Sequence, residues 1–246
     1  MKIKPLAIDL FCGLGGWADG LLAAGYEIVG FDIEHHIYGI HQYPAQLVVQ
    51  DVLTLVGSQF RDAALIVASP PCQRYSRMAM PFKRGKEEAR RIRADETGAS
   101  LKDLNVLFDA CWRIQKEAIE SAGRHIPLVI ENVKGAQPWV GRARWNFGSY
   151  YLWGDLPALM PVAQSAIKQG GSGRAWFDKE LTARRSKAAN AIKTGGDWFW
   201  KNGSTSMMRR ASSGSPARRF ASALIAKIPF DLSYHIGRSF YPGSSA

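Results

Sequence analysis

Short apolar segments, each followed by a polar or glycine-rich turn, constrain the fold more than any other feature of this sequence. The predicted strands cover residues 2–10, 26–32, 46–51, 63–68, 127–130 and 149–153. Apolar residues at helical spacing lie between several of them, most clearly over residues 101–123. Strands that alternate with helices predict an α/β fold with a doubly wound, mainly parallel sheet. Ligands of such sheets bind beyond the carboxyl ends of the strands, so the residues there are candidates for a functional site.

The composition changes after about residue 156. Residues 1–156 carry the strand and helix pattern, whereas residues 157–213 are rich in Gly, Ser, Lys and Arg, with interleaved Trp and Phe. We interpret this second segment as a small, basic, loop-rich lobe. Within residues 214–246, an amphipathic pattern over 217–228 predicts a helix that returns to the first domain.

The formal net charge of +11 favours a polyanionic partner, with nucleic acid ahead of an anionic membrane. No run of about 18 apolar residues occurs, so we expect no transmembrane helix, and the N-terminus lacks the apolar core of a signal peptide. Cys12, Cys72 and Cys111 are widely spaced and form no CxxC pair, which argues against a zinc site or a disulfide framework. We therefore expect a cytoplasmic monomer without a metal site.

A glycine-rich turn, FCGLGG at residues 11–16, follows the first predicted strand and opens a helix. Glycine lets a ligand approach the backbone, although a packing turn would have the same composition, and the spacing is not that of the dinucleotide motif GxGxxG. Asp32 ends the second predicted strand, where an acid can bind ribose hydroxyls. Asp51 ends the third, where it would accept from an adenine amine or cap the segment after it.

The segment SPPCQ, residues 69–73, follows the fourth predicted strand. Two prolines stiffen this turn and keep the chain extended before Cys72. Basic residues in segment 74–84 would favour the thiolate form of Cys72, the form that acts as a nucleophile. The alternative is an inert, packed thiol, which is the usual state of a free cysteine and our interpretation of Cys12 and Cys111.

Three stretches resemble signature motifs of the C5-cytosine DNA methyltransferases, in the family's order. They are DLFCGLGG at residues 9–16, SPPCQ at 69–73 and ENV at 131–133. The resemblance covers residues 3 to about 155, and the size is similar to that of short phage- or prophage-encoded members. It implies S-adenosylmethionine as methyl donor and double-stranded DNA as partner, in a bacterial or phage-infected cell.

The resemblance also implies a cofactor site. Phe11 would stack on the adenine, and Asp32 would hold the ribose hydroxyls. The other residues assigned to this site are Gly13, Leu14, Gly15, Ile33, Asp51, Pro71 and Ser215. Ser215 stands where the family has an asparagine before its last helix.

The implied reaction is covalent catalysis on a flipped cytosine. Cys72 would add to C6 and so make C5 nucleophilic. Glu131 would hold N3 of the base, and Asn132 would hold the loop or the base edge. Residues 74–98, rich in Arg, Lys and Gly, would form a mobile loop that closes over the base; a solvated surface segment is the alternative.

The resemblance implies further contacts to the substrate. Arg142 and Arg144 would orient the base, although Val140 stands where the family has glutamine, and surface phosphate contacts are the alternative. The residues expected to contact DNA are Gln73, Ser76, Arg77, Arg184, Arg185, Arg209 and Arg210. The short recognition lobe predicts a short target.

Three other functions stay open at this point. The first is methylation of RNA or tRNA, although the common RNA enzymes of this type use two active-site cysteines and Glu131-Asn132 stands where the second would be needed. The second is methylation of a free pyrimidine nucleotide, which the basic lobe does not favour. The third is a catalytically silent DNA-binding module, which intact Cys72 and Glu131 argue against.

Overall fold

The computed structural model describes residues 3–76, 82–161 and 215–243. Its strands form one seven-stranded sheet in the order β3-β2-β1-β4-β5-β7-β6. The bounds are β1 Leu6–Leu10, β2 Glu27–Asp32, β3 Gln46–Val49, β4 Ala63–Ala68, β5 Leu128–Asn132, β6 Trp145–Phe147 and β7 Tyr150–Gly154. Strands β1 to β5 are parallel, whereas β7 is antiparallel to β5 and β6 to β7. The predicted α/β class with a mainly parallel, doubly wound sheet is confirmed.

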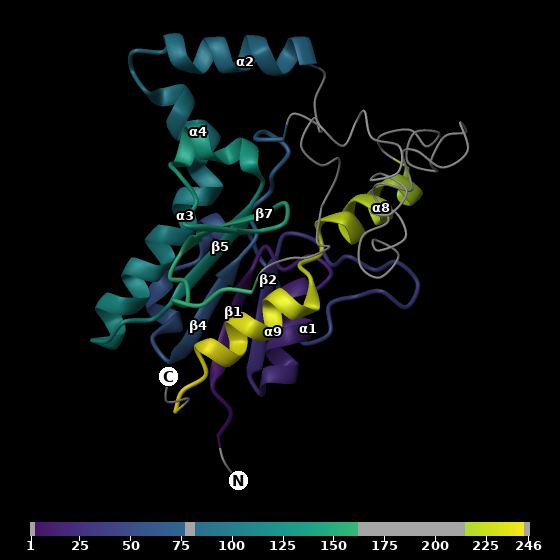
Figure 1. Ribbon diagram of the computed structural model, residues 1–246, viewed down its shortest axis with the longest axis vertical. Coiled ribbons are helices and arrows are strands. Elements are labelled where there is room, and N and C mark those ends of the chain that lie inside the picture. Colours follow the sequence, from purple (N-terminus) through teal and green to yellow (C-terminus); the bar gives the residue numbers. More distant parts are fainter. Residues whose placement is uncertain (1–2, 77–81, 162–214, 244–246) are drawn as a thin grey trace.

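Helices cover both faces of the sheet, with α3 on one face and α1 and α9 on the other (Figure 1). The helices are α1 Gly16–Ala24, α2 Phe82–Ala94, α3 Ala99–Ala122, α4 Gln137–Val140, α8 Pro216–Ala226 and α9 Phe230–Ser239. Three short 3-10 turns complete the described elements: η1 Val52–Thr54, η2 Gly57–Phe60 and η3 Lys134–Ala136.

Alternate residues of each central strand enter two different cores. In β4, Ile66 packs with Phe108 and Ile114 of α3, while its neighbour Leu65 packs on the opposite face with Leu21 of α1. This follows from strand geometry, because successive side chains point to opposite faces. A sheet buried on both faces explains why these strands are continuous apolar runs rather than alternating ones.

The helix that packs closely against α1 is α9. A Cβ built on Gly20 would lie 2.3 Å from the backbone nitrogen of Tyr234, so the two helices are in contact there. The hydroxyl of Ser233 also donates to the carbonyl oxygen of Trp17. The helix predicted over 217–228 is α8, and Phe220 within it contacts the ring of Tyr38 at 5.1 Å between centroids. The end of that segment also meets α1, because Ile228 is buried in the same core cluster as Trp17.

One segment was predicted wrongly and one strand was not predicted. Residues 74–98 were expected to be a loop, but α2 occupies Phe82–Ala94, because the run KEEARRIRA consists largely of good helix formers. Strand β6, Trp145–Phe147, was not predicted, since three residues give too short a pattern.

Some sequence predictions concern residues outside the described part. The basic lobe was placed at 157–213, and only residues 157–161 of it are described. Within the described ranges, no helix is long and apolar enough to cross a membrane. The same ranges contain no group of three or more His, Cys, Asp or Glu side chains arranged to hold a metal ion.

Candidate active site

The glycine turn after β1 lies against the end of β2. The amide of Gly13 donates to Oδ2 of Asp32 at 2.9 Å. Gly13 has φ +51, and a Cβ built there would meet no described atom within 4 Å, so the backbone is open on that side. Gly15 differs, because its Cβ would lie 2.3 Å from Cδ of Pro44. Gly13 thus fits the approach of a ligand, whereas Gly15 fits close packing.

Asp32 is held as a carboxylate by its surroundings. Burial alone would raise its pKa, but the close imidazole of His36 and hydrogen bonds from the amides of Gly13 and Glu34 outweigh this and lower the pKa. Nε2 of His36 lies 3.6 Å from Oδ1 of Asp32. The carboxylate of Asp32 in turn raises the pKa of His36, against the effect of burial. An ionised acid therefore stands beside the glycine turn.

The other residues predicted at this end of the sheet differ in exposure. Oδ1 of Asp51 accepts from the amide of Leu53 at 2.9 Å, so it caps η1, the alternative role considered from the sequence. Ile33 is 65% exposed, and Phe11 adopts a left-handed φ of +58 directly before the glycines. Leu14 is buried in the turn.

Cys72 lies in a compact turn after β4. The amides of Tyr75 and Ser76 donate to the carbonyl oxygen of Cys72 at 3.0 and 2.8 Å. Ser69, just before the two prolines, accepts from Nε1 of Trp17 at 2.9 Å, which ties the start of the turn to α1. The Cys72 side chain is half-buried, unlike the buried thiols of Cys12 and Cys111. Burial raises the pKa of both those thiols, as expected for packed cysteines.

Glu131 and Asn132 are the last residues of β5, the strand beside β4, and both are buried. Nδ2 of Asn132 donates to the carbonyl oxygen of Pro70 at 3.0 Å, and its Oδ1 accepts from the amide of Val133 at 2.8 Å. A Cβ built on Gly135 would lie 2.1 Å from the carbonyl oxygen of Tyr75. Segments 69–76 and 131–135, about 60 residues apart in the chain, are thus in direct backbone contact.

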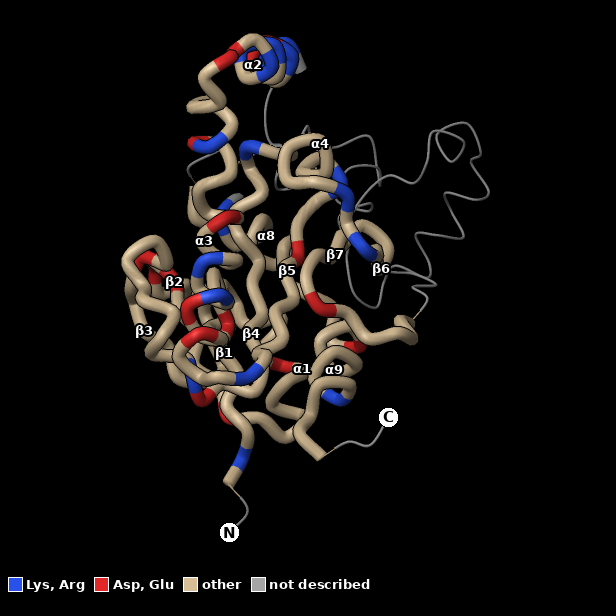
Figure 2. The backbone as a smooth tube through the Cα atoms, turned by 90° about the vertical axis from the view of Figure 1, so that its left-hand side faces the viewer, with Lys and Arg blue, Asp and Glu red and all other residues tan. Residues whose placement is uncertain are grey.

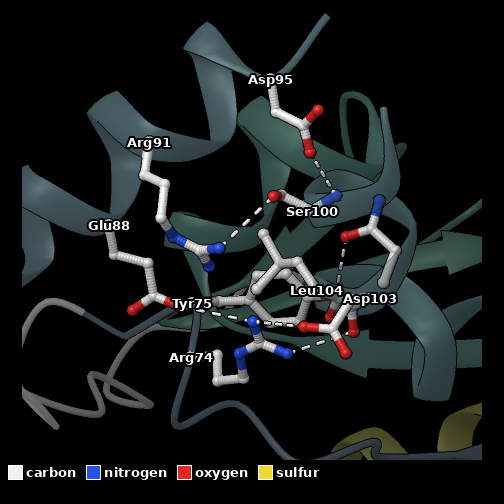
Figure 3. A network of polar contacts seen from close by, with 9 residues as sticks. Arg74, Tyr75, Glu88, Arg91, Asp95, Ser100, Asp103 and Leu104 are labelled. Carbon is white, nitrogen blue, oxygen red and sulfur yellow. Dashed lines mark hydrogen bonds and ion pairs between the residues drawn. The ribbon is translucent and has the colours of Figure 1, made fainter. Parts of the chain in front are cut away.

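A network of polar contacts that was not predicted from the sequence supports the Cys72 turn (Figure 3). The hydroxyl of Tyr75 lies 3.2 Å from the carbonyl oxygen of Leu104 and 3.0 Å from Oδ1 of Asn105. Nδ2 of Asn105 donates to the carbonyl oxygen of Trp139 at 2.9 Å. Nη2 of Arg74 lies 2.9 Å from Oδ2 of Asp103. These partners are 29 or more residues away in the sequence, so no local pattern indicates them.

The two arginines predicted to orient a base are exposed. Nη1 of Arg144 donates to the carbonyl oxygen of Gly154 at 2.9 Å. Gly154 pairs with Val129, whereas Asn132 pairs with Tyr151 three residues away. The Arg144 guanidinium therefore lies at the end of β7 that is farther from Asn132.

The remaining predicted residues fall into three groups. Pro71 and Gln73 line a hollow between the Cys72 turn and α3, together with Leu104 and Leu107. Ser215 precedes α8, where its carbonyl oxygen accepts from the amide of Arg219. Arg77, Arg184, Arg185, Arg209 and Arg210 lie outside the described residues.

Comparisons with solved structures give weak overall similarity. An E. coli prophage protein assigned as a DNA modification methyltransferase is 24% identical, with a TM-score of 0.35 over 54% of this chain and 33% of its own. The S. pombe Dnmt2 methyltransferase is 19% identical, with a TM-score of 0.36 over 56% of this chain and 37% of its own. The Entamoeba histolytica methyltransferase EhMeth is 13% identical, with a TM-score of 0.47 over 97% of this chain and 98% of its own. This chain thus spans about a third of the length of the first two proteins.

The comparison with curated proteins gave no match. The family model of the C-5 cytosine-specific DNA methylase, in contrast, matches residues 6–136, more than half of the chain. The matched region contains the glycine turn, the Cys72 turn and the end of β5, the three segments that meet at the carboxyl edge of the sheet. The chain belongs to the C-5 cytosine-specific DNA methylase family.

Proposed function

We propose that this protein transfers a methyl group from S-adenosylmethionine to C5 of a flipped cytosine in duplex DNA. The observation that carries the proposal is the hydrogen bond from Asn132 to the carbonyl oxygen of Pro70. It fixes the Cys72 turn against the end of β5, so that a nucleophile and the carboxyl group of Glu131 stand at the ends of adjacent strands.

The residues of the glycine turn fit the proposed cofactor. The open backbone at Gly13 leaves room for a ligand, and the ionised Asp32 beside it offers acceptors for ribose hydroxyls. We assign Phe11 to the adenine and Pro71 to the end of the cofactor that faces Cys72. S-Adenosylmethionine, when bound, would supply an electrophilic methyl group.

The proposed chemistry follows from the electronic structure of cytosine, whose C5 is a poor nucleophile in the aromatic ring. The thiolate of Cys72 adds to C6, and the electron pair displaced from the C5–C6 double bond makes C5 nucleophilic. Glu131 holds a proton at N3 and offsets the charge that develops on the ring. After C5 is methylated, loss of the C5 proton and of the thiolate restores the double bond and frees Cys72.

Duplex DNA is proposed as substrate because the chain is strongly basic, with a formal net charge of +11. C6 and the N3 edge of a paired cytosine are inaccessible in a duplex, so the base must leave the stack. We assign target recognition to the lobe at 157–213. We assign base contacts to Arg142 in preference to Arg144, because the Arg144 guanidinium is bound to Gly154.

The experiment is methyl transfer from labelled S-adenosylmethionine to unmethylated duplex DNA, to RNA and to dCMP, followed by nucleoside mass analysis. The proposal predicts 5-methyldeoxycytidine in the DNA digest. Label in RNA or dCMP alone would overturn the choice of substrate. Cofactor binding without transfer to any of the three would overturn the activity and favour a silent binder.

A further inference from the structure

The side chain of Trp17 links the two turns of the candidate site. Trp17 is the second residue of α1, directly after the glycine turn, and it is only 2% exposed. Its indole Nε1 donates to Oγ of Ser69 at 2.9 Å, although the two residues are 52 positions apart. Ser69 precedes Pro70 and lies three positions before Cys72. One side chain thus reaches from the glycine turn to the start of the Cys72 turn.

The hydrogen bond to Ser69 does more than satisfy the indole. A buried tryptophan needs an acceptor for its one N–H group, and many oxygens could supply it. Ser69, however, also donates its own amide to the carbonyl oxygen of Leu10 at 3.1 Å. Pro70 and Pro71 follow and supply no amide hydrogens. Ser69 is therefore the residue at which β1 and α1 together hold the Cys72 turn, just before the chain stiffens.

The α1 end of this link is held in place by the chain around α9. The hydroxyl of Ser233 donates to the carbonyl oxygen of Trp17. A Cβ built on Gly16 would clash with the backbone nitrogen of Ile228, so the segment before α9 is pressed against the start of α1. Figure 2 shows α1 and α9 side by side. The indole therefore extends from a fixed helix, and the Ser69 end is the one that it positions.

We infer that Trp17 is a positioning residue for methyl transfer, and that it acts through Ser69 to set the separation between the glycine turn and the Cys72 turn. The inference rests on the proposed function, since it takes the glycine turn as the cofactor site and Cys72 as the nucleophile. Methyl transfer needs the methyl carbon close to C5 of the base and in line with the breaking bond, and an error of about 1 Å can cost about 100-fold in rate. The two reactants are held by different turns, so the bond between the turns controls this distance.

The fate of the base bound to Cys72 reports the separation. Once the thiolate has added to C6, C5 takes up either the methyl group or a proton from water. In both cases the original C5 hydrogen then leaves as a proton, the thiolate departs and the double bond returns. Tritium placed at C5 is therefore released by both routes, whereas only one route adds a methyl group. The number of methyl groups transferred per tritium released measures how well the donor is placed, whatever the rate at which Cys72 adds.

The test uses the full-length chain, methyl-labelled S-adenosylmethionine and duplex DNA with tritium at C5 of cytosine. We expect this ratio to fall about three- to tenfold in Trp17→Phe and in Ser69→Ala, because each removes one partner of the same hydrogen bond. Ser69→Thr keeps the hydroxyl and should stay near the wild-type ratio. Trp17→Phe/Ser69→Ala should be no worse than either single variant, since the bond can be lost only once. Trp112→Phe, at an exposed position of α3, is the matched control and should leave the ratio unchanged.

The outcomes separate this inference from the proposed function. An unchanged ratio in Trp17→Phe and Ser69→Ala, or additive losses in the double variant, would overturn the inference even if the wild-type chain methylates DNA. The rate at which iodoacetamide alkylates Cys72, assigned by peptide mapping, needs neither cofactor nor DNA. If the wild-type chain methylates no cytosine, a rate that changes in both single variants but not in Ser69→Thr would keep the link and overturn the reaction. Equal alkylation rates in such a chain would overturn both.

Discussion

The side-chain amide of Asn132 donates to the carbonyl oxygen of Pro70 at 3.0 Å, in a place where both residues are buried. It links the end of β5 to a turn whose two prolines supply no amide hydrogens for a backbone ladder. A side chain from another strand therefore helps to set the position of Cys72. This relationship makes Asn132 a positioning residue in the proposed reaction.

Replacing Asn132 by aspartate should disturb the Cys72 turn. The carboxylate would face the Pro70 carbonyl oxygen and leave two buried acceptors opposed, at a cost of about 1–3 kcal/mol. We expect methyl transfer to fall about 100-fold, since a displacement of 1 Å is enough for such a loss, while cofactor affinity stays near the wild-type value. Single-turnover rates and calorimetric cofactor titration measure the two effects. Unchanged turnover would remove Asn132 from the account.

Tyr75→Phe should affect turnover through the same turn. The variant keeps the buried ring but removes the hydroxyl bonded to Leu104 and Asn105. We expect a loss of about 1–2 kcal/mol in unfolding free energy and a lower kcat. The KM for DNA should change little, because the hydroxyl is buried against α3. Chemical denaturation and steady-state kinetics test this. A change confined to KM would show that Tyr75 contacts the substrate instead.

Gly20→Ala should destabilise the contact between α1 and α9. The new methyl group would lie 2.3 Å from the backbone nitrogen of Tyr234, which cannot move without shifting α9. Overpacking of this kind costs about 1–3 kcal/mol. Ala23→Ser, at an exposed position of the same helix, is the control and should change stability by less than about 0.5 kcal/mol. Equal melting temperatures for the two variants would contradict the close packing.

The pair of His36 and Asp32 should give a pH-dependent contribution to stability. Asp32 raises the pKa of His36 in the folded state, so this contribution is complete below the unfolded pKa of about 6.5 and is lost as the pH rises through the folded value. The lowered pKa of Asp32 adds a contribution that is lost only at strongly acid pH. We expect His36→Gln to lower the free energy of unfolding by about 0.5–1 kcal/mol more at pH 5.5 than at pH 8.5. The melting temperature should therefore fall more at the lower pH. His35→Gln is the control, and a pH-independent difference for His36→Gln would contradict the pairing.

Much of this fold could be predicted because its strands are buried on both faces and end at marked turns. Ala63–Ala68 was predicted at its observed bounds, and Gly25, with φ +103, ends α1 as its position suggests. The contacts that hold the Cys72 turn could not be predicted. Asn105 and Asp103 lie within a helical pattern, and only the folded chain brings them to Tyr75 and Arg74. Helix α2 was not predicted, because its glycine and its dense charge are as typical of a loop as its good helix formers are of a helix.

The central claim is that Cys72 forms a covalent bond to C6 during methyl transfer to C5. The most direct measurement uses duplex DNA with 5-fluorocytosine at the target. Fluorine replaces the C5 proton that a base must remove in the last step, so the reaction stops at the adduct. With S-adenosylmethionine present, we predict a complex that survives denaturation and whose peptide map places the DNA on Cys72. Methyl transfer to ordinary DNA by the same preparation, with no such complex or with the adduct on another residue, would contradict the account.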